Sequence, residues 1–125
     1  MPGTDAMKAA MQAYVDRFNA GDLEGVLALY ADNASAEDPV GTSFHQGKEA
    51  LRKFYATAIE TGGRLELVAP MRGSQSNFAA MAFDVKLKLP SGPATVRVID
   101  VMSFDEEGKI SSMRAFWGPD DYIAG

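Results

Sequence analysis

Cysteine is absent from the 125-residue chain. This absence excludes disulfides, thiolate nucleophiles, zinc–cysteine sites and iron–sulfur clusters. Histidine occurs only once, at His45, and neither an HxxxH spacing nor a pair of carboxylates surrounds it. We therefore expect a solvated loop histidine, no metal site, and chemistry performed by oxygen and nitrogen groups.

Basic residues are also few and scattered, since 12 lysines and arginines stand against 17 acidic residues. Nucleic-acid binding driven by phosphate charge therefore has no electrostatic basis. No stretch approaches the roughly 18 apolar residues of a membrane span, and the first residues lack the basic and apolar regions of a signal peptide. We expect a cytoplasmic protein without a nucleic-acid or membrane partner.

The chain carries no GxSxG, GxGxxG or GxxxxGK[ST] motif. No motif therefore indicates a hydrolase with a catalytic triad, a dinucleotide-binding domain or a site for nucleotide phosphates. The length and the 46% content of hydrophobic residues suit one domain over residues 1–125, with a core but without a separate cofactor domain.

Helical periodicity dominates the first half of the sequence. Apolar residues recur at helical spacing in a first helix that begins at Thr4 or Asp5, either of which could act as its N-cap. A second helix is capped by Asp22 and includes Tyr30, and a third covers residues 48–60. This spacing places Tyr14 and Tyr30 on buried helix faces.

The second half alternates between apolar and polar residues. Four strands are expected there, after a short strand that ends at Asp38 before Pro39. The four strands cover residues 64–70, 78–89, 94–104 and 109–117. Helices followed by antiparallel strands predict an α+β fold, in which a curved, mainly antiparallel sheet wraps three helices.

One strand contains an acid on an apolar face. The even positions of the strand over residues 94–104 are Val96, Val98, Asp100, Met102 and Phe104. Burying a charged carboxylate costs several kcal/mol, so a raised pKa and a neutral acid that can donate a hydrogen bond are expected. The alternative, which is commoner for an isolated strand aspartate, is an ionised Asp100 that binds Arg97, Arg114 or a turn amide.

Asp38 and Tyr14 each have an ordinary interpretation. An aspartate before proline often begins a turn, and a tyrosine on a buried helix face is often a core residue. Together with Asp100 they supply a base and two hydrogen-bond donors, which is the set required to remove a proton next to a carbonyl. Asp38 and Asp100 could also form a glycosidase pair, although their apolar neighbours suit sugars poorly.

The sequence resembles bacterial steroid Δ-isomerases, the ketosteroid isomerase family, over nearly its entire length. The resemblance is strongest in residues 19–32, in SAEDPVG ending at Gly41, and in VIDVMSFDEEGKISSMRAFWG ending at Gly118. It implies a cone-shaped NTF2-like fold, a homodimer and no cofactor. It also implies conversion of a 5-ene-3-ketosteroid to the conjugated 4-ene ketone.

The resemblance further assigns roles to individual residues. It implies that Asp38 is the general base and that Tyr14 and Asp100 bind the oxyanion, supported by a network of Tyr30 and Tyr55. An aspartic acid kept neutral by an apolar site is a known property of this family. The implied steroid pocket contains Phe54, Met81, Phe83, Met113 and Trp117.

Three alternatives stay open from the sequence. The five pocket residues could equally be ordinary core, because alternation along two strands predicts only a buried face. Polyketide-cyclase-like and epoxide-hydrolase-like enzymes share this fold type and also place acids in an apolar cone. A non-catalytic module that binds an apolar ligand would have no need for a protonated Asp100.

Overall fold

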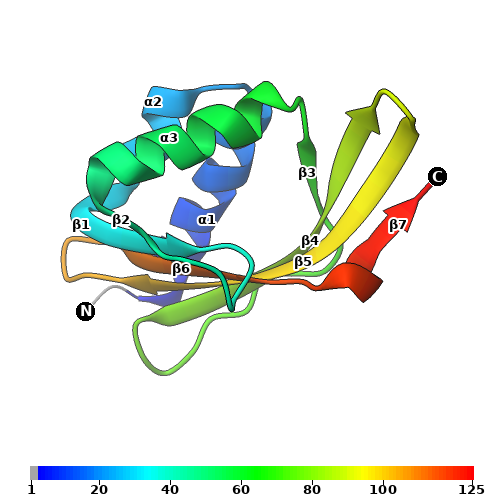
Figure 1. Ribbon diagram of the computed structural model, residues 1–125. Coiled ribbons are helices and arrows are strands. Elements are labelled where there is room, and N and C mark those ends of the chain that lie inside the picture. Colours follow the sequence, from blue (N-terminus) through cyan, green and yellow to red (C-terminus); the bar gives the residue numbers. More distant parts are fainter. Residues whose placement is uncertain (1–2) are drawn as a thin grey trace.

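A curved sheet with helices against one face forms the protein, seen in a computed structural model that describes residues 3–125 (Figure 1). The helices are α1 (Thr4–Asn19), α2 (Leu23–Leu27), α3 (Gly47–Glu60) and the 3-10 helix η1 (Pro119–Asp121). The strands are β1 (Tyr30–Glu37), β2 (His45–Gln46), β3 (Arg64–Leu67), β4 (Phe78–Leu89), β5 (Gly92–Phe104), β6 (Ile110–Phe116) and β7 (Tyr122–Ala124).

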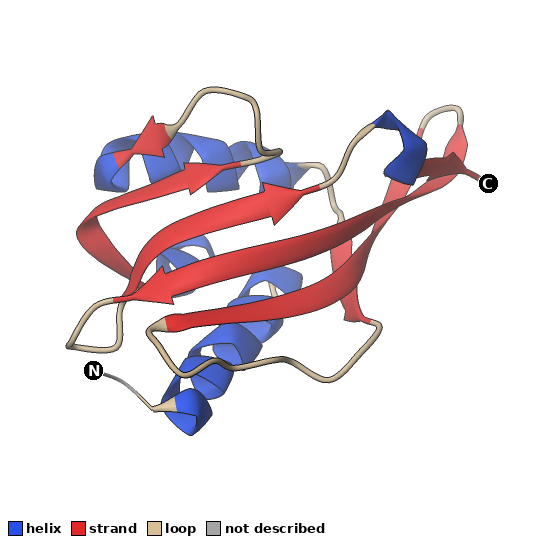
Figure 2. Cartoon of the chain, turned by 90° about the horizontal axis from the view of Figure 1, so that it is seen from below, coloured by secondary structure: helices blue, strands red, loops and turns tan. Residues whose placement is uncertain are grey.

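The strands form one mixed sheet in the order β2-β1-β6-β5-β4-β3, and β7 pairs with β5. Only the β1–β6 pair is parallel within residues 3–125, while the other pairs of these strands are antiparallel. Helices α1, α2 and α3 lie on one side of this sheet, and β4 and β5 bend around them (Figures 1 and 2). The predicted α+β fold, with three helices on a curved and mainly antiparallel sheet, is confirmed.

Strand parity decides which side chains meet the helices. All five even positions of β5 predicted to share an apolar face are buried, and Asp100 is among them. Helix α1 contributes Met7, Met11, Tyr14 and Phe18, which recur every three or four residues, to the same core. The helices and the sheet therefore enclose one apolar interior with a carboxyl group inside it.

Several predicted boundaries are wrong. The N-cap of α1 is Gly3, and the predicted caps Thr4 and Asp5 lie inside the helix. Helix α2 ends at Leu27, so Tyr30 begins β1, where it is aligned with Ile110 of β6. Pairing with a strand far along the chain overrides the helical pattern here, although Tyr30 is still buried.

The prediction of a loop position for His45 is also wrong. His45 belongs to the short strand β2, is aligned with Ala36 of β1, and is only partly exposed. Its ring lies 4.6 Å from the ring of Phe54, measured between centroids. None of the helices formed by residues 3–125 combines the length and apolar character that crossing a membrane requires.

Candidate active site

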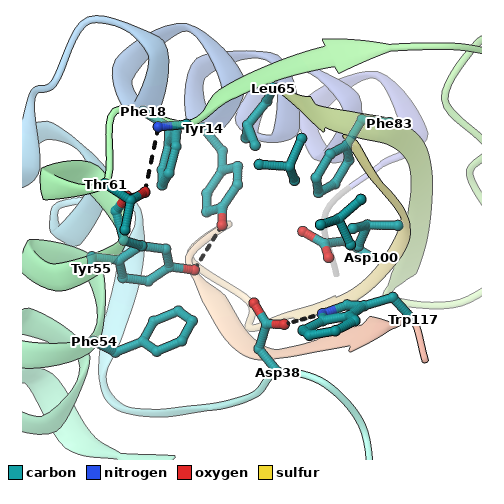
Figure 3. Close-up of a pocket in the computed structure, with 15 residues that line it drawn as sticks. Tyr14, Phe18, Asp38, Phe54, Tyr55, Thr61, Leu65, Phe83, Asp100 and Trp117 are labelled. Carbon is teal, nitrogen blue, oxygen red and sulfur yellow. Dashed lines mark hydrogen bonds between the residues drawn. The ribbon is translucent and has the colours of Figure 1, made fainter. Parts of the chain in front are cut away.

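A cavity of about 170 Å³ lies between α1, α3 and the inner face of the sheet (Figure 3). Its walls are mainly aliphatic and aromatic. Oxygen-bearing side chains line it at Tyr14, Asp38, Tyr55, Thr61 and Asp100. Tyr14, Asp38 and Asp100 come from a helix, a loop and a strand, and their polar ends face a common space (Figure 3).

Asp100 lies in the middle of β5 and is only 1% exposed. Neither of its carboxyl oxygens has a hydrogen-bond partner among the described residues. Burial raises the pKa of Asp100 well above its usual range, and the nearby charge of Asp38 raises it further. This direction of the pKa shift favours the neutral carboxylic acid, which has a proton to donate into the cavity.

The alternative in which an arginine holds an ionised Asp100 does not occur. Arg97 lies 3.6 Å from the carboxylate of Asp121, and Arg114 donates to Glu37 at 3.1 Å. Both arginines belong to outward-facing positions of their strands, because the residues on either side of each are buried. Among residues 3–125, neither arginine therefore compensates a charge on Asp100.

Asp38 follows directly after β1 and has different surroundings. Its Oδ1 atom accepts a hydrogen bond of 2.7 Å from the indole Nε1 of Trp117. Burial raises the pKa of Asp38, while this hydrogen bond and the charge of His45 act in the opposite direction. Asp38 thus has a donor that stabilises its ionised form, which Asp100 lacks.

Three tyrosines form a hydrogen-bonded chain behind the cavity. The hydroxyl of Tyr55 lies 2.8 Å from that of Tyr14 and 2.5 Å from that of Tyr30. Burial raises the pKa of each of the three phenols, so all of them are protonated at neutral pH. Tyr55 can donate to Tyr14 or accept from it. Tyr14 has a single O–H, so it can donate into the cavity that it lines when Tyr55 is the donor of this pair.

The structure separates the five predicted pocket residues into two groups. Phe54, Phe83 and Trp117 line the cavity with the two acids. Met81 and Met113 do not line it: they are 2% and 1% exposed and belong to the hydrophobic core. Both methionines do face inward as their strand parity predicts, but parity alone cannot tell a core position from a cavity wall.

Some cavity residues escaped the sequence analysis. Phe18 lines the cavity four residues after Tyr14, and this helical spacing could have identified it. The hydrogen bond from Trp117 to Asp38 joins residues 79 positions apart, and no local pattern signals it. Thr61, an exposed residue just after α3, also has no recognisable signal.

The arrangement brings two carboxyl groups and a phenol together in an apolar enclosure. Asp38 can accept a proton when ionised, and Tyr14 and Asp100 can donate to an oxygen placed between them. Residues 3–125 contain no cluster of three or more histidine, aspartate or glutamate side chains arranged to hold a metal ion. The site therefore suits proton transfer on a substrate with one polar atom and an apolar body.

Comparison with known proteins gives three kinds of similarity. The SnoaL-like domain family matches residues 11–113. A steroid Delta-isomerase of Nocardioides simplex is 38% identical over 117 residues, which cover 94% of each protein. The epoxide hydrolase LasB of Streptomyces lasalocidi is 33% identical over 125 residues, which cover 97% of this chain and 44% of LasB.

A solved structure of the epoxide hydrolase/cyclase-like enzyme SalBIII, which acts in pyran ring formation in the polyether salinomycin, has a similar fold. It superimposes with a TM-score of 0.92 at 26% identity, and all of both chains is covered.

Proposed function

The chain belongs to the SnoaL-like domain family and, within the NTF2-like superfamily, to the ketosteroid isomerases, and from this membership we propose that it is a steroid Δ-isomerase. The proposed reaction moves the double bond of a 5-ene-3-ketosteroid into conjugation with the ketone. One observation carries the proposal: the buried Asp100, whose two oxygens have no hydrogen-bond partner in the part of the chain that the structure describes, lines the same cavity as Asp38 and Tyr14. A neutral acid without a partner is suited to donate to an oxygen that becomes negative during a reaction.

In the proposed mechanism, the Asp38 carboxylate removes a proton from the carbon between the ketone and the double bond. The electrons of that carbon–hydrogen bond move towards the ketone and give a dienolate, whose negative charge collects on the former ketone oxygen. Tyr14 and Asp100 donate hydrogen bonds to this oxygen. Loss of one such donor in a water-excluded site commonly raises the barrier by about 2.7 to 4 kcal/mol.

The second half of the reaction returns the same proton. Protonated Asp38 donates it to the far end of the dienolate, which restores the ketone and leaves the double bond conjugated with it. The carboxyl group acts first as base and then as acid, so no proton is gained or lost and no cofactor takes part. The bond from Trp117 to Asp38 supports this role, since it orients the carboxyl group between the two positions.

The walls of the cavity favour a flat, apolar substrate. Aromatic rings of Phe54, Phe83 and Trp117 line it together with aliphatic side chains. A rigid hydrocarbon skeleton can bury its surface against such walls without leaving polar groups unpaired. The exposed Thr61 marks the rim, where the end of the substrate distant from the reacting ketone would lie.

The proposal includes a homodimer of a single domain over residues 1–125. The sheet face turned away from the helices exposes several large apolar side chains, which a second copy would cover. These residues are Val68, Phe78, Ile99 and Phe116. The cytoplasmic location stays a prediction from the sequence.

Epoxide opening is the second candidate function, and the similarity to LasB and SalBIII favours it. A neutral Asp100 could protonate an epoxide oxygen while Asp38 removes the proton of the attacking hydroxyl group. The carbon–oxygen bond of the epoxide would then break as the new one forms. Both reactions would use an ionised Asp38 and a neutral Asp100. Only a test with each substrate can therefore distinguish isomerisation from epoxide opening.

Ultraviolet absorbance tests the proposal directly. Purified protein is mixed with a 5-ene-3-ketosteroid, and the growth of the conjugated enone is followed for the wild type and for Asp38→Asn. A parallel reaction contains a hydroxy-epoxide and is analysed for ring-opened or cyclised product. Fast enone growth in the wild type alone supports the isomerase; product only from the epoxide overturns it in favour of the second candidate, and no product from either points to a binding module.

A further inference from the structure

The segment that carries Asp38 is fastened to β6 through the residue before it. Glu37 is the last residue of β1 and points to the opposite side of the sheet from Asp38, because neighbouring residues of an extended chain alternate. Its side chain accepts two hydrogen bonds: Oε2 from the backbone N–H of Gly41 at 2.9 Å, and Oε1 from Nε of Arg114 at 3.1 Å. Glu37 thus connects Gly41, at the far end of the turn that contains Asp38, with Arg114 of the neighbouring strand β6.

The backbone repeats this connection. Val40 donates its N–H to the carbonyl of Ala115 at 2.8 Å. In the sheet, Glu37 is aligned with Arg114, and Ala115 is aligned with Asp100 of β5. Arg114 and Ala115 of β6 therefore hold the segment around Asp38 on one side of this strand, and Ala115 lies beside Asp100 on the other.

Gly41 makes the closed turn possible. Its φ of +105° lies in a region that residues with a side chain rarely adopt, and it lets the backbone N–H of Gly41 turn back towards Glu37. This N–H is also the first cause of a lowered pKa at Glu37, with Arg114 as a further cause, so Glu37 is ionised at neutral pH. A glutamate that is only 6% exposed and has both carboxylate oxygens bonded holds one position.

We propose that Glu37, together with Arg114, is a positioning residue that sets the distance between the carboxylate of Asp38 and the oxyanion site at Asp100. The inference rests on the proposed proton transfer, in which one carboxylate must reach two carbon atoms while the substrate oxygen stays at Asp100. Displacing a reacting group by about 1 Å can cost roughly 100-fold in rate. Glu37 touches no reacting atom, and it acts through the backbone of the turn.

The contribution to rate should exceed the contribution to stability. The side chain of Arg114 is 50% exposed, and ion pairs with such an exposed partner contribute little to folding. Without the Glu37 carboxylate, the turn keeps one backbone hydrogen bond to β6, from Val40 to Ala115, so we expect the turn to loosen locally while the sheet stays paired. The expected signature is a lower kcat in a protein that is folded and still binds ligands.

Steady-state kinetics of Glu37→Ala and Glu37→Gln tests the inference. For Glu37→Ala we expect kcat to fall about 10- to 100-fold while KM changes little. Glu37→Gln should recover part of this loss, since its amide oxygen can still accept from Gly41. The matched controls are Glu24→Ala and Glu24→Gln, which break an exposed ion pair with Arg52 away from the cavity and should leave kcat unchanged.

Two further measurements separate positioning from a merely structural role. Binding of 2-naphthol, whose oxygen can sit between Tyr14 and Asp100, should be unchanged in Glu37→Ala. Amide hydrogen exchange at Val40 and Gly41 should become faster in this variant, with no change in the strands. Wild-type kcat in Glu37→Ala would overturn the inference, and so would a fall in kcat matched by an equal loss of 2-naphthol affinity.

The proposed function can fail separately from this inference. If the wild type does not isomerise the steroid, the proposed function is wrong, whatever Glu37 does. The exchange experiment then still decides whether Glu37 holds the turn: unchanged exchange at Gly41 would overturn that claim, and faster exchange would support it.

Discussion

Two parts of the cavity wall hold the same type of side chain in different surroundings: we call β5 with the fully buried Asp100 the closed end, and the turn after β1 with the partly exposed Asp38 the open end. At the closed end, Asp100 lies within β5, is covered on all sides, and has no hydrogen-bond partner among residues 3–125. At the other end, Asp38 lies in a turn, is partly exposed, and accepts a bond from Trp117. The comparison teaches that surroundings, and not residue type, separate the proposed donor Asp100 from the proposed base Asp38.

The largest effect should come from making the same substitution at both ends. Asp38→Asn removes the only group proposed to accept the proton, and kcat should fall about 10²- to 10⁴-fold. Asp100→Asn replaces one neutral donor by another, and kcat should fall by no more than about tenfold, which corresponds to roughly 1.4 kcal/mol. Kinetics of the two variants under identical conditions checks this, and equal losses would break the comparison.

The next effect concerns the closed end alone. Asp100→Ala deletes the donor, and kcat should fall about 10²- to 10³-fold, as for the loss of other oxyanion donors. Asp100→Asn is the control, because it keeps both the volume and a donor. If the alanine and asparagine variants had the same kcat, donation by Asp100 would not contribute to the reaction.

A smaller effect should appear at the open end. Trp117→Phe removes the hydrogen bond that opposes the raised pKa of Asp38, so this pKa should rise further. The base must be ionised, so kcat/KM increases with pH through the pKa of Asp38 in the free enzyme. The acid limb of the pH profile should therefore move to higher pH in the variant, and a limb that stays or moves to lower pH would contradict the assignment.

The last prediction concerns stability and leaves the reaction aside. The pKa of Asp100 is raised in the folded protein, whereas in the unfolded chain it is about 3.9. Between these two values only the folded state keeps the proton, so the free energy of unfolding should fall by about 1.4 kcal/mol per pH unit as pH rises. Asp100→Asn has no carboxyl group at this position, so its free energy of unfolding lacks this pH dependence. Urea denaturation at several pH values should show that the stability of the variant relative to the wild type increases with pH. A constant difference would indicate that the carboxyl group is ionised throughout.

Much of the closed end could be predicted from the sequence, because strand periodicity is local. The strand β4 has the predicted ends at residues 78 and 89, and the parity of β5 predicted the burial of Asp100. Side chains of a strand alternate between the two faces of the sheet, so the face of a residue in the middle of a strand follows from that of its neighbours. The local pattern could not, however, separate cavity wall from core, and the structure places the predicted pocket residues Met81 and Met113 in the core.

The open end depends on contacts between distant parts of the chain. Trp117 meets Asp38, Arg114 meets Glu37, and Tyr30 joins β1 because β6 lies beside it. Each of these contacts arises from the parallel pairing of β1 with β6, which connects residues about 80 positions apart. Local spacing carries no information on such pairing, so the partners of the base could not be predicted.

The protonation states of Asp38 and Asp100 at neutral pH are the central claim, and carbon-13 NMR of carboxyl-labelled aspartate tests it most directly. The signals of the two residues are assigned from their absence in Asp38→Asn and Asp100→Asn, and then followed as pH is changed. We predict that at pH 7 the Asp38 carboxyl has the chemical shift of a carboxylate and the Asp100 carboxyl that of a carboxylic acid. An Asp100 signal that has already titrated at the ordinary pH of an aspartate would contradict the account.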